Sequence, residues 1–280
     1  MNLLKATAED FPGRFREVIS DPLNLLIARV PMAGVVEQKE VYLHNGNRVP
    51  VTGQGSYYGD FSLLLVMNRG VHEPLEEYVF QELLRVLPEA PLMIELGAYW
   101  GHYSMWLKKL RPKSQVILVE PDRGNLEVGA KNFVRNGFQG EFIQSVVGVG
   151  HLEVDQFLGS RNLARLDILH TDIQGYEGQM LQGAQKTLMA QAIDYLFIST
   201  HSQELHSQIV NELARLHYRV EVSSDFDNDT TSFDGFVFAS SPRVKEVFKD
   251  FVPIGRAKIA ESPPDQLLQG LVKLRSCTAI

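Results

Sequence analysis

The chain has a single cysteine, Cys277, among its 280 residues. One cysteine cannot form an internal disulfide, and it excludes a metal site built from several cysteines. We interpret Cys277, which lies near the C-terminus, as an incidental thiol rather than a nucleophile. Disulfide-rich scaffolds and cysteine-based metalloproteins are therefore excluded.

Long apolar runs and an excess of positive charge are also missing. No run approaches the roughly 20 residues that a membrane helix needs, and the N-terminus has no signal-peptide pattern. The formal net charge of -7 argues against a nucleic-acid partner, because proteins that bind a phosphate backbone usually carry a basic face. We therefore expect a cytoplasmic protein that binds neither nucleic acid nor a membrane.

The first quarter of the chain predicts a small extension packed on a larger α/β domain. A short helix is expected over Glu9–Ser20, and a β-hairpin over Glu40–Val51 with its turn at Asn45–Gly46. Thr52–Asp60 is a loop rich in glycine and tyrosine, which is either a lid over a site or a plain connector. Phe61–Met67 is expected to be a strand.

A helix is predicted to begin just after His72. Pro74 suits its first turn, and the acids Glu73, Glu76 and Glu77 complement the positive end of the helix dipole. We expect these acids to cap the helix and to face solvent. Glu73 is also a candidate for contact with a substrate, because it lies just ahead of the strand described next.

The most informative stretch is a short apolar strand, Leu92–Leu96, followed by a turn with the spacing G-x-x-x-G from Gly97 to Gly101. A dinucleotide site has an additional glycine that lets the backbone approach a diphosphate, and bulky Tyr99 occupies the middle of this turn. A diphosphate would fit badly there. An adenosyl ligand without phosphates would fit, and S-adenosylmethionine is the common one.

A second strand, Gln115–Val119, is followed by Glu120, which is well placed to accept hydrogen bonds from both ribose hydroxyls. A third strand, Glu141–Val147, brings Gln144 and Ser145 toward the expected position of the adenine. The residues predicted to contact the cofactor are Glu95, Gly97, Ala98, Tyr99, Gly101, Ser104, Glu120, Pro121, Gln144, Ser145, Asp172 and Gln174.

The second half of the sheet supplies candidates for the chemistry. Strands at Leu166–Ile173 and Ala192–Thr200 place Asp172 and His201 at neighbouring carboxyl ends, where open parallel sheets bind their ligands. His201 is the predicted general base, with Asp172 orienting or replacing it. The pair could alternatively hold a divalent cation, but spacing names no third ligand, and no metal is predicted.

Other residues in this half are candidates for substrate contact. Glu177 lies in the first turn of the next helix, where it either caps the helix or contacts a ligand. The predicted substrate-binding residues are Glu73, Gln174, Glu177 and His201. The loop Asp225–Gly235 lacks the calcium-loop order and is expected to be either a solvated loop or a substrate rim. Further strands are expected at Tyr218–Ser223 and Phe236–Ala239.

Three segments together resemble the FkbM family of S-adenosylmethionine-dependent methyltransferases. They are Glu95–Ser104, Val119–Asp122 and above all Ile168–Glu177, whose D-x-x-G-x-E pattern is followed by Leu181–Ala184. The similarity runs from about His72 to Pro242. It implies glycine-loop and ribose roles for Glu95, Gly97, Gly101 and Glu120, and signature roles for Asp172, Gly175 and Glu177.

The resemblance implies an α/β fold with the Rossmann-like, seven-stranded sheet of class I methyltransferases, its last strand antiparallel. Residues 1–71 would then be an extension with a hairpin, a lid or oligomer contact. Residues 72–242 would be the cofactor-binding core, and residues 243–280 a tail with helices after Pro242 and after Pro264.

The resemblance further implies O-methylation of a hydroxyl on a small molecule, sugar or natural product. The alternatives are N-methylation of a peptide or natural-product amide or amine, and a module that binds the cofactor or a partner without transferring methyl. A nicotinamide oxidoreductase is disfavoured by Tyr99. A homodimer is compatible with the sequence.

Overall fold

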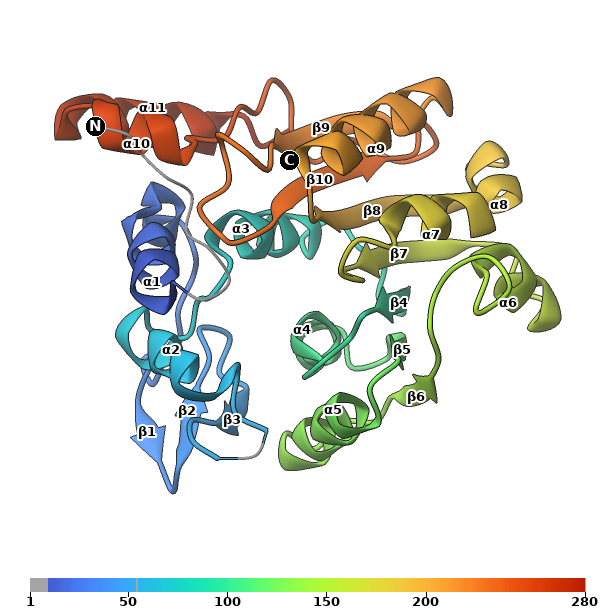
Figure 1. The fold of residues 1–280 in the computed structure, drawn as a ribbon, viewed down its shortest axis with the longest axis horizontal. Coiled ribbons are helices and arrows are strands. Elements are labelled where there is room, and N and C mark those ends of the chain that lie inside the picture. The colour runs from blue at the N-terminus through green and yellow to red at the C-terminus, as the bar shows by residue number, and fades with distance from the viewer. Residues whose placement is uncertain (1–9, 54, 280) are drawn as a thin grey trace.

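The computed structural model describes residues 10–53 and 55–279, and a seven-stranded sheet forms its centre (Figure 1). The strands are β4 (Leu92–Leu96), β5 (Gln115–Glu120), β6 (Glu141–Gln144), β7 (Leu166–Thr171), β8 (Ile193–Thr200), β9 (Arg219–Ser224) and β10 (Gly235–Ser240). Their order is β6-β5-β4-β7-β8-β10-β9. The first five run parallel, whereas β10 is antiparallel to both β8 and β9. The expected class I sheet with a reversed last strand is confirmed.

The central strands are apolar on both faces because helices cover the sheet on both sides. Every residue of β8 is buried. One face carries α3 (Pro74–Leu83), α4 (His102–Leu110) and α5 (Arg123–Arg135) (Figure 1). The other carries α6 (Val154–Ser160), α7 (Glu177–Gly183), α8 (Gln185–Met189) and α9 (Gln203–Arg215). Two separate clusters of buried apolar side chains lie on the two sides of the sheet.

The extension before the sheet packs on the α3 and α4 side. Its helical segments are α1 (Phe11–Ser20), the 3-10 helices Pro22–Leu25 and Gly59–Ser62, and α2 (Leu63–Met67). Its strands are β1 (Val36–Glu37), β2 (Glu40–Tyr42) and β3 (Arg48–Pro50), which form a small antiparallel sheet. The hairpin prediction around Asn45–Gly46 is confirmed. The predicted first helix starts at Phe11, and Glu9 lies outside the described residues.

The strand predicted at Phe61–Met67 is wrong, because this segment is helical. Leu64 and Leu65 are both buried although they are neighbours, while Leu63 and Met67 are exposed. Burial that alternates every three to four residues is the period of a helix, and adjacent buried leucines do not fit a half-buried strand.

Polar contacts fix the extension to the core. Arg135 of α5 forms an ion pair with Glu40 of β2, with 2.6 Å between Nε and Oε1. The Arg48 N–H donates to Asn136 Oδ1 at 2.8 Å, and Asn136 Nδ2 donates back to the Arg48 carbonyl at 2.9 Å. One apolar cluster also runs continuously from Val18 in α1 to the C-terminal helix.

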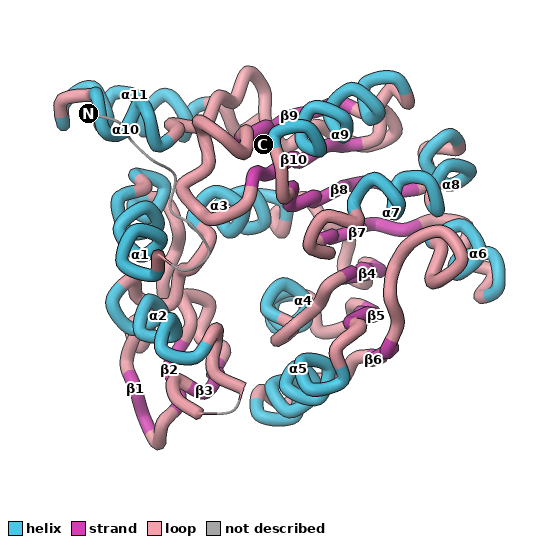
Figure 2. The backbone as a smooth tube through the Cα atoms, viewed as in Figure 1, coloured by secondary structure: helices cyan, strands magenta, loops and turns pink. Residues whose placement is uncertain are grey.

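The C-terminal tail departs from prediction in one place. Residues 242–255 form turns and irregular backbone rather than a helix (Figure 2). Here the N–H groups of Val247 and Phe248 donate to the buried Glu221 carboxylate at 2.7 and 2.8 Å, which replaces helical hydrogen bonds. Helices follow as α10 (Arg256–Glu261) and α11 (Pro264–Ser276). No helix in the described part of the chain is long and apolar enough to cross a bilayer.

The turn after β4 lies unusually close to the end of β7. Gly97 has a φ of +75°, and an added Cβ there would lie 1.6 Å from the Asp172 carbonyl oxygen. The Asp172 N–H also donates to the Leu96 carbonyl at 2.9 Å. Only glycine fits this position, both for its backbone conformation and for the space available.

We expect Gly97→Ala to lower the free energy of unfolding by at least about 3 kcal/mol, because the new Cβ must displace backbone. Gly137 is a matched control, since its φ is +72° and an added Cβ would meet no atom within 4 Å. Gly137→Ala should lower it by only about 1–2 kcal/mol, the strain of a left-handed residue. Urea unfolding measures both, and equal losses would contradict the close approach.

Candidate active site

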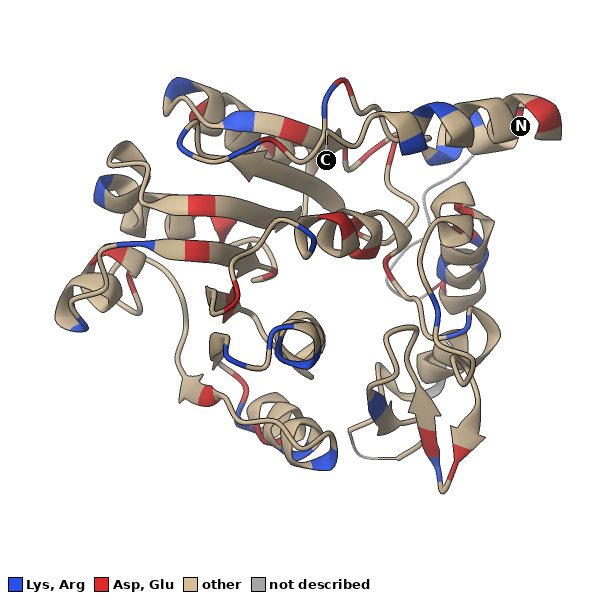
Figure 3. Ribbon diagram, turned by 180° about the vertical axis from the view of Figure 1, so that it is seen from behind, with Lys and Arg blue, Asp and Glu red and all other residues tan. Residues whose placement is uncertain are grey.

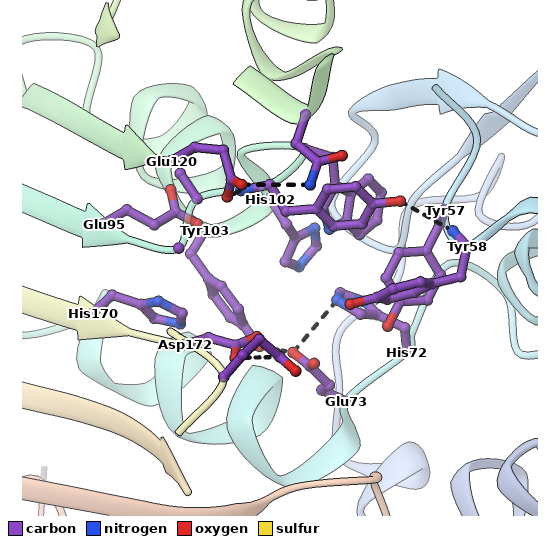
Figure 4. Close-up of a pocket in the computed structure, with 16 residues that line it drawn as sticks. Tyr57, Tyr58, His72, Glu73, Glu95, His102, Tyr103, Glu120, His170 and Asp172 are labelled. Atoms are coloured by element: carbon purple, nitrogen blue, oxygen red, sulfur yellow. Dashed lines mark hydrogen bonds and ion pairs between the residues drawn. The ribbon is translucent and has the colours of Figure 1, made fainter. Parts of the chain in front are cut away.

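A cavity of about 290 Å³ opens at the carboxyl ends of β4, β5 and β7, where the strand order reverses. Its size is at the lower limit of the roughly 300–1,000 Å³ typical of ligand pockets. Glu95 and Glu120 lie toward one end, whereas Glu73, Tyr103 and Asp172 come together at the other (Figure 4). The cavity therefore has two differently built halves.

The half near β4 and β5 is organised by two buried acids. Glu120 Oε2 accepts the Tyr99 N–H at 3.1 Å, and its Oε1 accepts the Asp122 N–H at 3.1 Å. Glu95 Oε2 accepts the Ser104 N–H at 3.1 Å, and burial raises the pKa of Glu95. These bonds fix the turn between Gly97 and α4 against the ends of both strands.

Several residues predicted from the sequence line this cavity. They are Glu73, Glu95, Gly97, Ala98, Tyr99, Glu120, Asp172 and Gln174. Gly101 and Ser104 do not line the cavity, and the Ser104 N–H donates to Glu95 instead. Gln144 lies away from the cavity and donates from Nε2 to the Pro121 carbonyl at 3.2 Å. The third strand ends at Gln144 rather than at the predicted Val147, and the contact of Gln144 and Ser145 with the adenine stays a prediction.

The other half of the cavity is acidic. Tyr103 Oη donates to Glu73 Oε2 at 2.8 Å, and His72 Nε2 lies 3.4 Å from the same oxygen. Burial raises the pKa of Glu73 to about 7. Gln174 Nε2 donates to Asp172 Oδ1 at 3.1 Å. The carboxyl groups of Glu73 and Asp172 thus face one region of the cavity. A methyl-accepting substrate that carries a hydrogen-bond donor could donate to either group.

His201 does not have the environment of a general base. Its Nδ1 lies 2.9 Å from Glu177 Oε1, and its Nε2 lies 3.2 Å from Asp172 Oδ1 and 3.5 Å from Asp234 Oδ1. Burial alone would lower the pKa of His201, but hydrogen bonds with Asp172 and Glu177 raise it to about 11. Three carboxylates thus surround the ring and favour its protonated form, which pairs with Asp172.

The prediction that Glu76 and Glu77 face solvent is wrong, because both side chains are buried. Glu76 Oε1 lies 2.6 Å from His170 Nε2, and Ser199 Oγ donates to Glu76 Oε2 at 3.2 Å. Burial raises the pKa of Glu76 to about 8. The first turn of α3 thus points into the protein, against the ends of β7 and β8.

The tyrosine-rich loop covers part of the cavity. The Tyr58 N–H donates to Tyr99 Oη at 3.1 Å, and Tyr99 Oη donates to the Ser56 carbonyl at 3.4 Å. The Tyr57 ring packs on Trp100 with centroids 4.9 Å apart. Lining residues that sequence reasoning did not select are Tyr57, Tyr58, His72, Trp100, His102, Tyr103, Asn125 and His170. The glycine and tyrosine content of the loop was a sequence signal for Tyr57 and Tyr58.

The family model of the methyltransferase FkbM domain matches residues 73–220, which is more than half of the chain. The chain belongs to the FkbM methyltransferase family. The match contains β4 to β8 and all of the cavity's lining residues except Tyr57, Tyr58 and His72. A comparison with curated proteins finds no match.

Several solved structures are similar to this FkbM methyltransferase at low identity. Precorrin-6y C5,15-methyltransferase from Geobacter metallireducens GS-15 is 13% identical with a TM-score of 0.43, covering 59% of this chain and 86% of that chain. TrmK from M. capricolum, in complex with S-adenosyl-homocysteine, is 12% identical with a TM-score of 0.42, covering 70% of this chain and 82% of that chain.

S-adenosylmethionine is the methyl donor of this family, and the residues present fit it. Glu120 ends β5 with its carboxylate in the cavity, where it can accept hydrogen bonds from ribose hydroxyls. Asn125 Nδ2 lies 3.4 Å from Glu120 Oε1 and offers another polar group beside it. Tyr99 stands in the turn where a diphosphate would need bare backbone. The chain is an S-adenosylmethionine-dependent methyltransferase.

We expect Glu120→Ala to weaken S-adenosylmethionine binding at least about tenfold, or about 1.4 kcal/mol, because the ribose loses its acceptor. Glu89→Ala is the matched control, since the exposed Glu89 side chain lies outside the cavity and the affinity of this variant should be unchanged. Isothermal titration calorimetry measures both. Unchanged affinity in Glu120→Ala, or an equal loss in Glu89→Ala, would contradict this placement of the cofactor.

His201 should also affect stability in a pH-dependent way. Its pKa is higher in the folded chain than the ordinary 6.5, so its stabilising contribution is full below pH 6.5 and decreases as pH rises toward about 11. The destabilisation caused by His201→Gln should therefore shrink from about pH 6 to about pH 9.5. Chemical denaturation of both proteins across this range measures it, and a constant or growing difference would contradict the imidazolium assignment.

Proposed function

We propose that this FkbM methyltransferase transfers methyl to a hydroxyl oxygen of a small molecule or sugar. The observation that carries the proposal is the pair of carboxyl groups, Glu73 and Asp172, at the end of the cavity away from Glu95 and Glu120 (Figure 4). A hydroxyl can donate to such a group and pass its proton to it as the new bond forms.

The same acidity disfavours the alternative nitrogen acceptors. An amine beside carboxylates is held as an ammonium, because an opposite charge favours the charged form, and an ammonium has no lone pair to attack with. An amide nitrogen would need a stronger base than a carboxylate. A hydroxyl is neutral, and it needs only an acceptor for its proton in the transition state.

Asp172 is the group that we assign to accept this proton. It lines the cavity with its side chain partly exposed, and His201 and Gln174 hold its Oδ1 at 3.2 and 3.1 Å. Asp172 thus replaces His201 as the predicted base, and His201 acts as a positioning residue. When bound, the cofactor supplies a methyl group that its sulfonium already activates. Besides accepting the proton, the chain needs only to align this methyl group with the acceptor oxygen.

A small acceptor fits the charge around the cavity better than a polyanion does. Lys and Arg are interspersed with Asp and Glu along the ribbon (Figure 3). Among the described lining residues there is no Lys or Arg, whereas four are acids. A phosphate backbone would be repelled by this lining, which supports a small molecule or sugar over nucleic acid as the acceptor.

The proposal is tested by incubating the chain with S-adenosylmethionine and panels of hydroxylated natural products, sugars and short peptides. Mass spectrometry should find a methyl increment on a hydroxyl oxygen, and fragmentation should place it there. Methyl increments on nitrogen alone would overturn the O-methylation proposal while leaving the family assignment intact.

Asp172→Asn should lower kcat by about 10²–10⁴-fold, because no carboxylate at position 172 then accepts the proton of the substrate hydroxyl. Affinity for S-adenosylmethionine, measured by calorimetry, should change much less. Asp227→Asn, an exposed residue of the Asp225–Gly235 loop, is the matched control and should keep wild-type kcat. An Asp172→Asn enzyme with wild-type kcat would remove Asp172 from the reaction.

A further inference from the structure

A second cluster of titratable groups lies beside the cavity, between the extension and the core. It contains His44 from the hairpin, His72 just before α3, Glu77 within α3, and His102, the first residue of α4. Their side chains are at most 2% exposed. These residues are far apart in sequence, yet they converge on one buried carboxylate.

The distances in this cluster suit a metal ion. Glu77 Oε2 lies 3.1 Å from His44 Nε2, and Glu77 Oε1 lies 3.8 Å from His102 Nε2. One donor atom from each of the three residues lies within 4.8 Å of the other two. Donors about 2.0–2.1 Å from a tetrahedral zinc ion are separated by about 3.3 Å, which is close to this spacing.

Hydrogen bonding does not account for the arrangement. Among the described residues, His44 Nε2, His102 Nε2 and Glu77 Oε2 are buried without a hydrogen-bond partner, although they lie close together. Leaving a buried polar atom unsatisfied costs about 1–3 kcal/mol, so several in one place need a common explanation. A shared ion would satisfy all three atoms at once, whereas the ion pair at 3.1 Å joins only His44 Nε2 and Glu77 Oε2.

We propose that His44, Glu77 and His102 bind one zinc ion. Two imidazoles and one carboxylate are ligands that zinc accepts, and water or a ligand would fill the fourth position. His72 Nδ1 lies 2.5 Å from Glu77 Oε1 and orients the carboxylate from outside the metal shell. His102 also lines the cavity, which gives the ion a path to the site.

A second group of three potential ligands, Asp172, His201 and Asp234, does not support the same proposal. There both His201 nitrogens already pair with carboxylates, Nδ1 with Glu177 at 2.9 Å and Nε2 with Asp172 at 3.2 Å. The buried cluster instead joins three segments, and its ion would fix the hairpin to the start of α4, directly after Gly101. The proposed ion, with three protein ligands and one open position, would therefore support the cofactor turn by cross-linking these segments.

The test uses the whole chain, stripped of metal with a chelator and titrated with zinc chloride alone. Calorimetry should show one equivalent bound, and thermal unfolding should shift to higher temperature with zinc. His44→Gln and His102→Gln should each weaken binding by about 100-fold or more, and His72→Gln by about 10–100-fold, as for residues outside the metal shell.

Two controls separate this site from others. His151→Gln removes an exposed histidine, and Asp234→Asn removes a ligand of the second group; both should bind zinc as the wild type does. If a cluster variant fails to fold, cobalt substitution of the wild-type chain decides, because a four-coordinate site gives visible absorption. Absence of stoichiometric zinc and cobalt binding by the wild type, or unchanged binding in folded His44→Gln and His102→Gln, would overturn the proposal.

Discussion

The close approach of Gly97 to the Asp172 carbonyl is the contact on which the site depends. β4 and β7 are parallel neighbours at the point where the strand order reverses, and their ends are tied by the bond from the Asp172 N–H to the Leu96 carbonyl. A side chain at position 97 would push the two ends apart. The glycine turn that receives the cofactor and the carboxylate proposed to face the acceptor therefore keep a fixed separation.

The charge of the cavity follows from the same arrangement. Four acids and no Lys or Arg are found among its described lining residues, so a cationic ligand is favoured. The methyl donor carries a positive sulfonium, whereas the product left after transfer is a neutral thioether. Acids in the lining that are ionised would therefore attract the sulfonium of the donor more than the neutral product.

Sequence patterns located the parts of the fold that are governed by local chemistry. β4, β5, β7 and β8 are mostly apolar runs that single acids such as Glu95 interrupt, and Glu120 and Asp172 follow from the rule that ligands bind at strand ends. What failed depends on contacts between distant segments. The burial of Glu77 could not be predicted without knowing that His44 packs against it. His201 was predicted to be a base because the sequence does not show that three carboxylates surround its ring. The Phe61–Met67 error had a different cause, since a short apolar run does not reveal its period.

Tyr99 connects the choice of cofactor to the extension before the sheet. Its position in the turn, with a φ of 43°, removes the bare backbone that a diphosphate would need. The hydroxyl of the same side chain binds the backbone of Ser56 and Tyr58 in the tyrosine-rich loop. A smaller residue at this position would leave the backbone of the turn more accessible. It would also remove the hydrogen bonds to Ser56 and Tyr58. The loop and the glycine turn are therefore coupled through Tyr99. We expect a substitution in residues 55–58 to change the binding of the cofactor as well as that of the acceptor.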